Sequence, residues 1–135
     1  MKNRAIKWLK ISFMIGAVVD SLALIPMLVP WAARIFWGFD DFTPIYYYAM
    51  GMGASLMLAW TILLFWAYRR PVERRFIALF TIIIIIGIMI TEIFAMGQGY
   101  YKPAYSLGFQ VVLIGLFGYS FVISSKKYLP FNYPI

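Results

Sequence analysis

The stretch FIALFTIIIIIGIMITEIFAM, residues 76–96, decides the fold class of this chain. Its only charged residue is Glu92, and its length matches the roughly 20 apolar residues that an α-helix needs to cross the hydrocarbon core of a bilayer. We predict a transmembrane span at residues 71–96, because Pro71 suits the first turn of a helix and Glu73 favours the helix dipole.

Three further apolar runs accompany this stretch. We predict spans at about residues 9–29, 44–68 and 103–124, the last two opened by Pro44 and Pro103. The first run is longer than the apolar core of a signal peptide, so we expect it to be retained. Four spans of about 20 residues leave almost nothing of the 135 residues for a soluble domain. The predicted fold is an all-α, integral membrane four-helix bundle that forms a single domain over residues 1–135.

The composition excludes several chemistries. Only 13% of the residues are charged and 64% are hydrophobic, whereas soluble domains have about 25% charged residues. The chain has no Cys and no His, which removes disulfides, thiol chemistry and the usual ligands of zinc, copper, haem and iron–sulfur clusters. We therefore predict no cofactor and no metal site. The net charge of +7 sits at the ends of apolar runs, so we also predict no nucleic-acid partner.

Lysine and arginine residues are distributed unequally between the two ends of the predicted spans. Ten of the twelve lie on the side that holds both termini and the connection between the second and third spans. Only Arg34 and Lys102 lie on the other side. Basic residues are enriched in the cytoplasmic connections of membrane proteins, so we predict that both termini face the cytoplasm.

The longest connection runs from Trp31 to Phe42, between the first two spans. If residues 31–37 are helical, Trp31, Ile35 and Phe36 fall roughly on one side, which is typical of a short helix in the membrane interface. An irregular loop with aromatic anchors is the alternative. We expect Asp40 and Asp41 to cap the following span.

Two acids lie within the predicted spans. Asp20 is near the middle of the first span, where a charged carboxyl costs about 2.5–3.5 kcal/mol on insertion scales. We expect it to face the bundle interior, beside the small residues Gly16 and Ala23, and to be protonated or partnered. Glu92 is shallower, and its depth differs from that of Asp20 by about one to two helical turns.

No lysine or arginine lies within the hydrophobic depth of the spans to balance these acids. We predict a ligand-binding set composed of Asp20, Glu92, Trp60, Ser55 and Gln110. Two interpretations stay open. Asp20 either hydrogen-bonds across helices and fixes their packing, or lines a cavity with Glu92, where the acids pair with a cationic ligand or carry a proton. The indole N–H of Trp60 lies deep in its span and requires an acceptor.

Small residues recur within the second and fourth spans. They are Gly51, Ser55 and Ala59 in the second, and Gly108, Gly115 and Gly118 in the fourth. Such rows let helix backbones approach closely, and we interpret them as packing faces. A pocket lined by backbone is the alternative.

The segment Arg69-Arg-Pro-Val-Glu-Arg-Arg75 forms a tight connection with four arginines, which also make a candidate headgroup-binding set: Arg69, Arg70, Arg74 and Arg75. With this segment and its general layout, the chain resembles small four-span membrane proteins of bacteria and archaea whose activity is uncharacterised. Its layout is also similar to DoxX-like proteins and to the EXPERA group of sterol isomerases. The resemblance implies a prokaryotic cytoplasmic membrane and, as in the EXPERA group, intramembrane acids that bind lipophilic amines or sterol intermediates.

Three functions compete. The leading hypothesis is a protein without enzymatic activity, or with little, that binds a lipid-like or lipophilic amine ligand in an intramembrane cavity near Asp20. The second is a structural or assembly protein, a homo-oligomer joined through its small-residue faces. The third is a proton-coupled transporter that uses Asp20 and Glu92 as its relay.

Overall fold

The computed structural model describes residues 2–99 and 105–127 of the chain. Its helices are α1 (Lys2–Leu28), α2 (Pro30–Trp37), α3 (Pro44–Arg69), α4 (Phe76–Gly97) and α5 (Tyr105–Lys127), and these described residues contain no strand. Four helices hold segments of 21 to 26 residues that are long and apolar enough to cross a membrane. The all-α prediction is confirmed, and the four long helices correspond to the four predicted spans. Lys102 and Pro103 lie outside the described residues.

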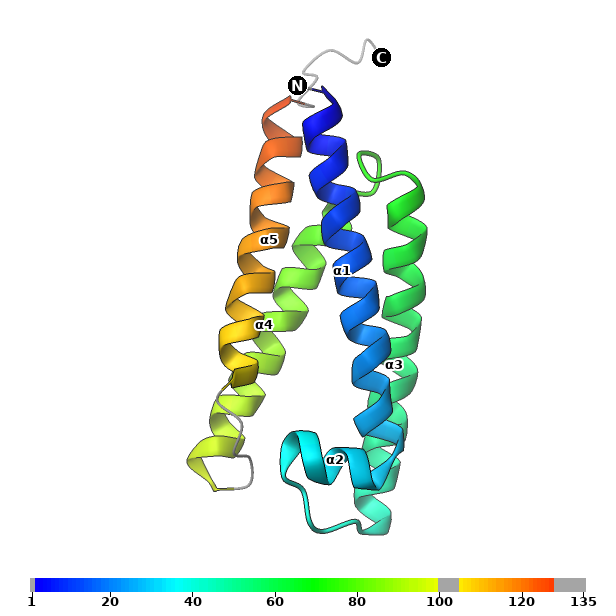
Figure 1. The fold of residues 1–135 in the computed structure, drawn as a ribbon, viewed down its shortest axis with the longest axis vertical. Coiled ribbons are helices and arrows are strands. Elements are labelled where there is room, and N and C mark those ends of the chain that lie inside the picture. The colour runs from blue at the N-terminus through cyan, green and yellow to red at the C-terminus, as the bar shows by residue number, and fades with distance from the viewer. Residues whose placement is uncertain (1, 100–104, 128–135) are drawn as a thin grey trace, which may run out of the picture.

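By their contacts, the long helices follow the order α3, α1, α5, α4. In Figure 1, α4 lies behind α5 and α1. Helix α1 is central, because it packs on α3 and on α5, while α4 packs mainly on α5. Helices α3 and α4 are consecutive in the chain yet make little contact with each other. We call the end of the bundle that holds the start of α1, the α3–α4 connection and the end of α5 the basic end. The opposite end is the α2 end.

The hydrophobic core lies in the half of the bundle nearer the basic end. All four long helices contribute to it, with these buried side chains: Leu9, Phe13 and Ala17 from α1, Leu64 and Ala67 from α3, Ile77, Ala78 and Ile85 from α4, and Leu113 and Phe117 from α5. The Phe13 and Phe117 ring centroids are 6.3 Å apart. A Cβ atom on Gly16 would lie 2.8 Å from Phe117 Cζ, so only glycine allows this close approach.

Toward the α2 end the two helix pairs, α1 with α3 and α4 with α5, diverge (Figure 1). Burial falls accordingly along the inner face of α1: Phe13 and Ala17 are fully buried, Asp20 is half-buried and Ser21 is exposed. The inner face of α5 changes in the same way between the buried Leu113 and the half-buried Gln110. The main cluster of buried apolar side chains therefore ends about halfway along α1, and scattered residues, such as Pro26, Ala54, Ala32 and Ala33, are buried nearer the α2 end.

Helix α2 lies across the opening between the two pairs (Figure 1). Its small residues Ala32 and Ala33 are buried, whereas Trp31 and Ile35 are 63% and 69% exposed. The hydroxyl of Tyr105, at the start of α5, donates a hydrogen bond to the Phe36 carbonyl at 2.7 Å. Helix α2 thus links α1 to α5 and turns large apolar side chains outward. Its position in a membrane interface stays a prediction.

The structure shows which residue caps α3, and it corrects the predicted start of α4. Thr43 caps α3, with its Oγ1 accepting a hydrogen bond from the Tyr46 N–H at 3.2 Å, and Pro44 follows as predicted. The prediction that Asp40 and Asp41 cap this helix was wrong, because both precede the cap and Asp40 pairs with Arg34 at 3.5 Å.

Helix α4 begins at Phe76 and not at Pro71. Residues 71–75 form a turn, which the chain needs in order to reverse direction between two antiparallel helices. At its other end α4 stops at Gly97, and Gly99 adopts the left-handed φ of +76° in the turn that follows.

Candidate functional site

The contacts between α1 and α3 fix which residues lie at the same depth. Leu64 lies against Gly16, and Met27 lies against Gly53. The helices are antiparallel, so a step along one corresponds to a step back along the other (Figure 1). Asp20 lies four residues from Gly16 toward the α2 end. Trp60 lies four residues from Leu64 in the same direction. Asp20 and Trp60 therefore lie at the same depth along the α1–α3 seam.

Helix α5 brings a third polar residue close to this depth. Phe117 lies against Gly16. Leu113 lies four residues from Phe117 toward the α2 end, so it is at the depth of Asp20. Gln110 is one turn farther in the same direction, about 4.5 Å along the axis at 1.5 Å per residue. Asp20 and Trp60, with Gln110 about one helical turn farther toward the α2 end, form a group that we call the polar layer. It begins where the hydrophobic core ends.

The polar layer carries unpaired hydrogen-bonding groups. Trp60 Nε1 and Gln110 Oε1 are buried, and neither has a hydrogen-bond partner within the described part of the chain. The half-buried Asp20 carboxyl likewise has no hydrogen bond or ion pair with any described residue. A buried polar group without a partner costs about 1–3 kcal/mol. One donor, one acceptor and one carboxyl are thus left without a protein partner among the described residues near the middle of the bundle.

Glu92 is held apart from this layer. The Ser106 hydroxyl donates a hydrogen bond to Glu92 Oε2 at 2.7 Å, which links α4 to α5. Ser106 lies seven residues from Leu113 toward the α2 end, about 10 Å along the helix axis. Since Leu113 marks the depth of Asp20, the two acids are nearly two turns apart and on diverging helix pairs.

Ser55 also lies outside the polar layer. It is exposed, and its hydroxyl donates to the Gly51 carbonyl of its own helix at 2.9 Å. Of the five residues predicted to bind a ligand, the structure places Asp20, Trp60 and Gln110 within about one helical turn of depth, and places Ser55 and Glu92 elsewhere.

The four arginines of the candidate headgroup-binding set lie around the α3–α4 turn. Arg74 donates to the Trp66 carbonyl, and its guanidinium stands 3.2 Å from the centroid of the Trp66 ring. Arg70 pairs with Glu73 at 3.4 Å. These contacts stabilise the turn itself. Headgroup binding by the four residues stays a prediction.

A buried hydroxyl pair joins α1 to α5 in the packed half, and sequence reasoning missed it. The Oγ atoms of Ser12 and Ser120 are 2.6 Å apart, and both residues are fully buried. Nothing in the sequence distinguishes these serines from Ser21 or Ser55, which bond only to carbonyls of their own helices. The pairing follows from how the helices pack.

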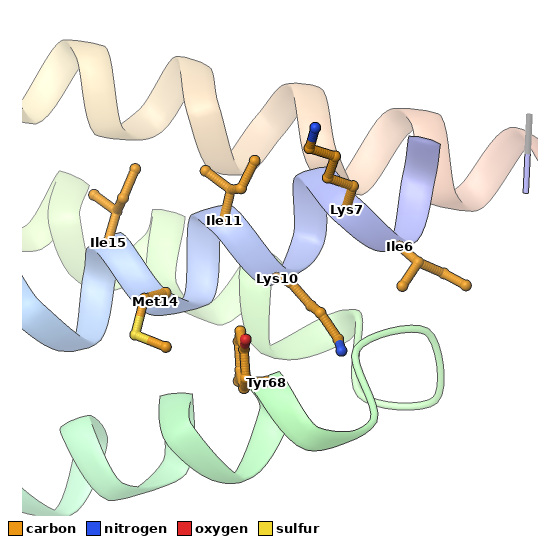
Figure 2. Close-up of a pocket in the computed structure, with 7 residues that line it drawn as sticks. All are labelled: Ile6, Lys7, Lys10, Ile11, Met14, Ile15 and Tyr68. Atoms are coloured by element: carbon orange, nitrogen blue, oxygen red, sulfur yellow. The ribbon is translucent and has the colours of Figure 1, made fainter. Parts of the chain in front are cut away.

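An open groove with a volume of about 620 Å³ lies at the basic end of α1, and none of the polar-layer residues lines it (Figure 2).

Among the described residues, no three His, Cys, Asp or Glu side chains come together to hold a metal ion. Comparison with protein-family models, curated proteins and solved structures gives no match.

Proposed function

We propose that this chain is a multi-pass protein of a prokaryotic cytoplasmic membrane, with both termini in the cytoplasm, that binds a lipophilic amine between its helices. The observation that carries this proposal is the polar layer. It presents a carboxyl, an N–H donor and a carbonyl acceptor within about one helical turn of depth, without protein partners among the described residues. Asp20 and Gln110 lie beyond the buried Ala17 and Leu113 toward the α2 end. This is the end at which the two helix pairs diverge (Figure 1).

Each group of the polar layer suits one part of such a ligand. An ammonium group next to Asp20 balances a charge that is costly at this depth in a membrane. The indole of Trp60 offers either its N–H or its ring face, and a ring face attracts a cation by about 0.5–2 kcal/mol. The Gln110 carbonyl accepts a hydrogen bond from a second N–H of the amine. The apolar part of the ligand then lies between the diverging helices.

The first test is a thermal-unfolding screen of the purified full chain with lipophilic amines, neutral sterols, quinones and fatty acids. A ligand at 100 times its dissociation constant stabilises the folded protein by about 2.7 kcal/mol. We expect amines to raise the unfolding temperature of the wild type and not of Asp20→Asn. The matched control is Asp41→Asn, which makes the same chemical change at an exposed position outside the long helices.

The outcomes separate binding from packing. If amines stabilise Asp20→Asn as strongly as the wild type, the carboxyl is not the counter-ion and the proposal is wrong. If no amine stabilises the wild type, and Asp20→Asn unfolds at the same or a higher temperature, Asp20 is only a polar group within the helix packing. Loss of the response in Asp41→Asn as well would point to a general effect of net charge.

A second function, self-assembly, is favoured by the small-residue row of α3. Ser55 and Ala59 are exposed, and a Cβ atom on Gly51 would meet nothing within 4 Å. This row is therefore not used in packing within the chain, which leaves it free to approach the same row of a second copy. Gly115 of α5 has equally open surroundings.

A further inference from the structure

The groove at the basic end of α1 combines two basic side chains with an apolar wall. Six of its lining residues come from α1 and Tyr68 comes from α3 (Figure 2). Lys7 and Lys10 lie toward the basic end of the groove, whereas Ile11, Met14 and Ile15 continue along α1 toward the membrane centre (Figure 2). The groove therefore changes from charged to apolar along the helix axis.

The charge of this groove is not balanced by the protein. None of its seven lining residues is acidic, and α1 has no acidic residue before Asp20. Lys10 Nζ lies 5.2 Å from the centroid of the Tyr68 ring, which orients the ammonium without neutralising it. Neither lysine forms an ion pair with a described residue. The site is complementary to a negative charge.

We propose that this groove binds an anionic phospholipid from the leaflet at the basic end, which is the cytoplasmic leaflet in the orientation proposed above. The phosphate lies beside Lys10, on the side of α1 that faces Tyr68, while Lys7 extends to the opposite side of α1 and adds its charge (Figure 2). An acyl chain follows Ile11, Met14 and Ile15 toward the membrane centre. The volume of about 620 Å³ lies within the range of about 300–1,000 Å³ typical of small-molecule sites.

This assignment differs from the headgroup-binding prediction made from the sequence. The arginine segment was the more prominent basic feature, but Arg70 and Arg74 are engaged with Glu73 and Trp66. Lys7 and Lys10 border an apolar surface that can hold a chain. A site for a whole lipid needs both parts, and the groove supplies them together.

The experiment measures retention of lipid by the full chain with native mass spectrometry and by thermal unfolding. The probes are phosphatidylglycerol, phosphatidylcholine with the same acyl chains, and inorganic phosphate. We expect phosphatidylglycerol to bind, and the Lys7→Gln/Lys10→Gln double variant to weaken it about tenfold or more, because each basic residue near the surface adds to the attraction. Lys7→Arg/Lys10→Arg, which keeps both charges, should retain binding.

The matched control is Arg69→Gln/Arg70→Gln, which removes the same charge at the same end but outside the groove. An equal loss in this control would overturn the proposal in favour of general attraction to the arginine turn. Equal binding of phosphatidylcholine, or displacement of the lipid by inorganic phosphate, would also overturn it. Asp20→Asn should leave this lipid binding unchanged, so the two proposed sites succeed or fail separately.

Discussion

The half of the bundle at the basic end and the half at the α2 end consist of the same four long helices, yet they pack differently. In the basic half, apolar side chains from all four helices meet, and glycine and serine residues let α1 approach its neighbours. Toward the α2 end, Asp20 and Gln110 are half-buried beyond this cluster, Trp60 packs against it, Glu92 bonds to Ser106, and the helix pairs diverge (Figure 1).

This difference shows that the contacts that stabilise the fold and the groups proposed to bind a ligand lie in different parts of the bundle. Lipid solvates an apolar side chain as well as another helix does, so association within a membrane depends on close packing and on interhelical hydrogen bonds. The basic half has both. Asp20, Trp60 Nε1 and Gln110 Oε1 have no hydrogen-bond partner among the described residues, and such intramembrane groups are typical of binding sites.

The largest effect on unfolding is expected from a matched pair of Phe→Ala substitutions. Phe117 is fully buried in the basic half, and Phe94 is 68% exposed toward the α2 end. Phe117→Ala should lower the free energy of unfolding by about 3 kcal/mol, because it leaves a cavity in the packed half. Phe94→Ala should change it by less than about 0.5 kcal/mol. Denaturant unfolding in one detergent measures both, and similar losses would refute the contrast between the halves.

A smaller effect is expected from the buried hydroxyl pair. Ser12→Ala/Ser120→Ala removes the interhelical contact of 2.6 Å between α1 and α5 and should lower the free energy of unfolding by about 0.6–2 kcal/mol. Ser55→Ala removes only a bond within α3 and should have little effect. A double-mutant cycle over Ser12 and Ser120 measures their coupling. Zero coupling would mean that the two hydroxyls act independently.

The smallest effect on unfolding is expected at Gly51. Gly51→Leu should leave the free energy of unfolding of the monomer nearly unchanged, because a side chain there meets nothing within 4 Å. The same substitution blocks a close approach between two α3 helices, so it should abolish any dimer seen by light scattering or crosslinking. Gly87→Leu is the control, since it is equally open but lies on α4, outside both small-residue rows. A monomeric wild type would rule out the assembly function.

The residues that form the helices were predictable because each signal is local. Apolar runs long enough to span a membrane gave four helices, and Thr43 with Pro44 marked the start of α3 within one residue. The start of α4 was misplaced by five residues, because a proline suits a turn as well as a first helical turn. Asp20 and Glu92 were conspicuous from sequence because charge is rare within spans.

The sequence by itself determined that the chain has four candidate membrane spans and that two acids lie within them, where lipid solvates charge poorly. Length, hydropathy and charge are local properties that can be read one segment at a time. Only the tertiary structure decided that Asp20, Trp60 and Gln110 lie within about one turn of depth, that Glu92 pairs with Ser106, and that Ser12 contacts Ser120. It also decided that Lys7 and Lys10 border a groove. These facts depend on how the helices are arranged and in which register, and both are set by contacts between residues that are distant in the chain.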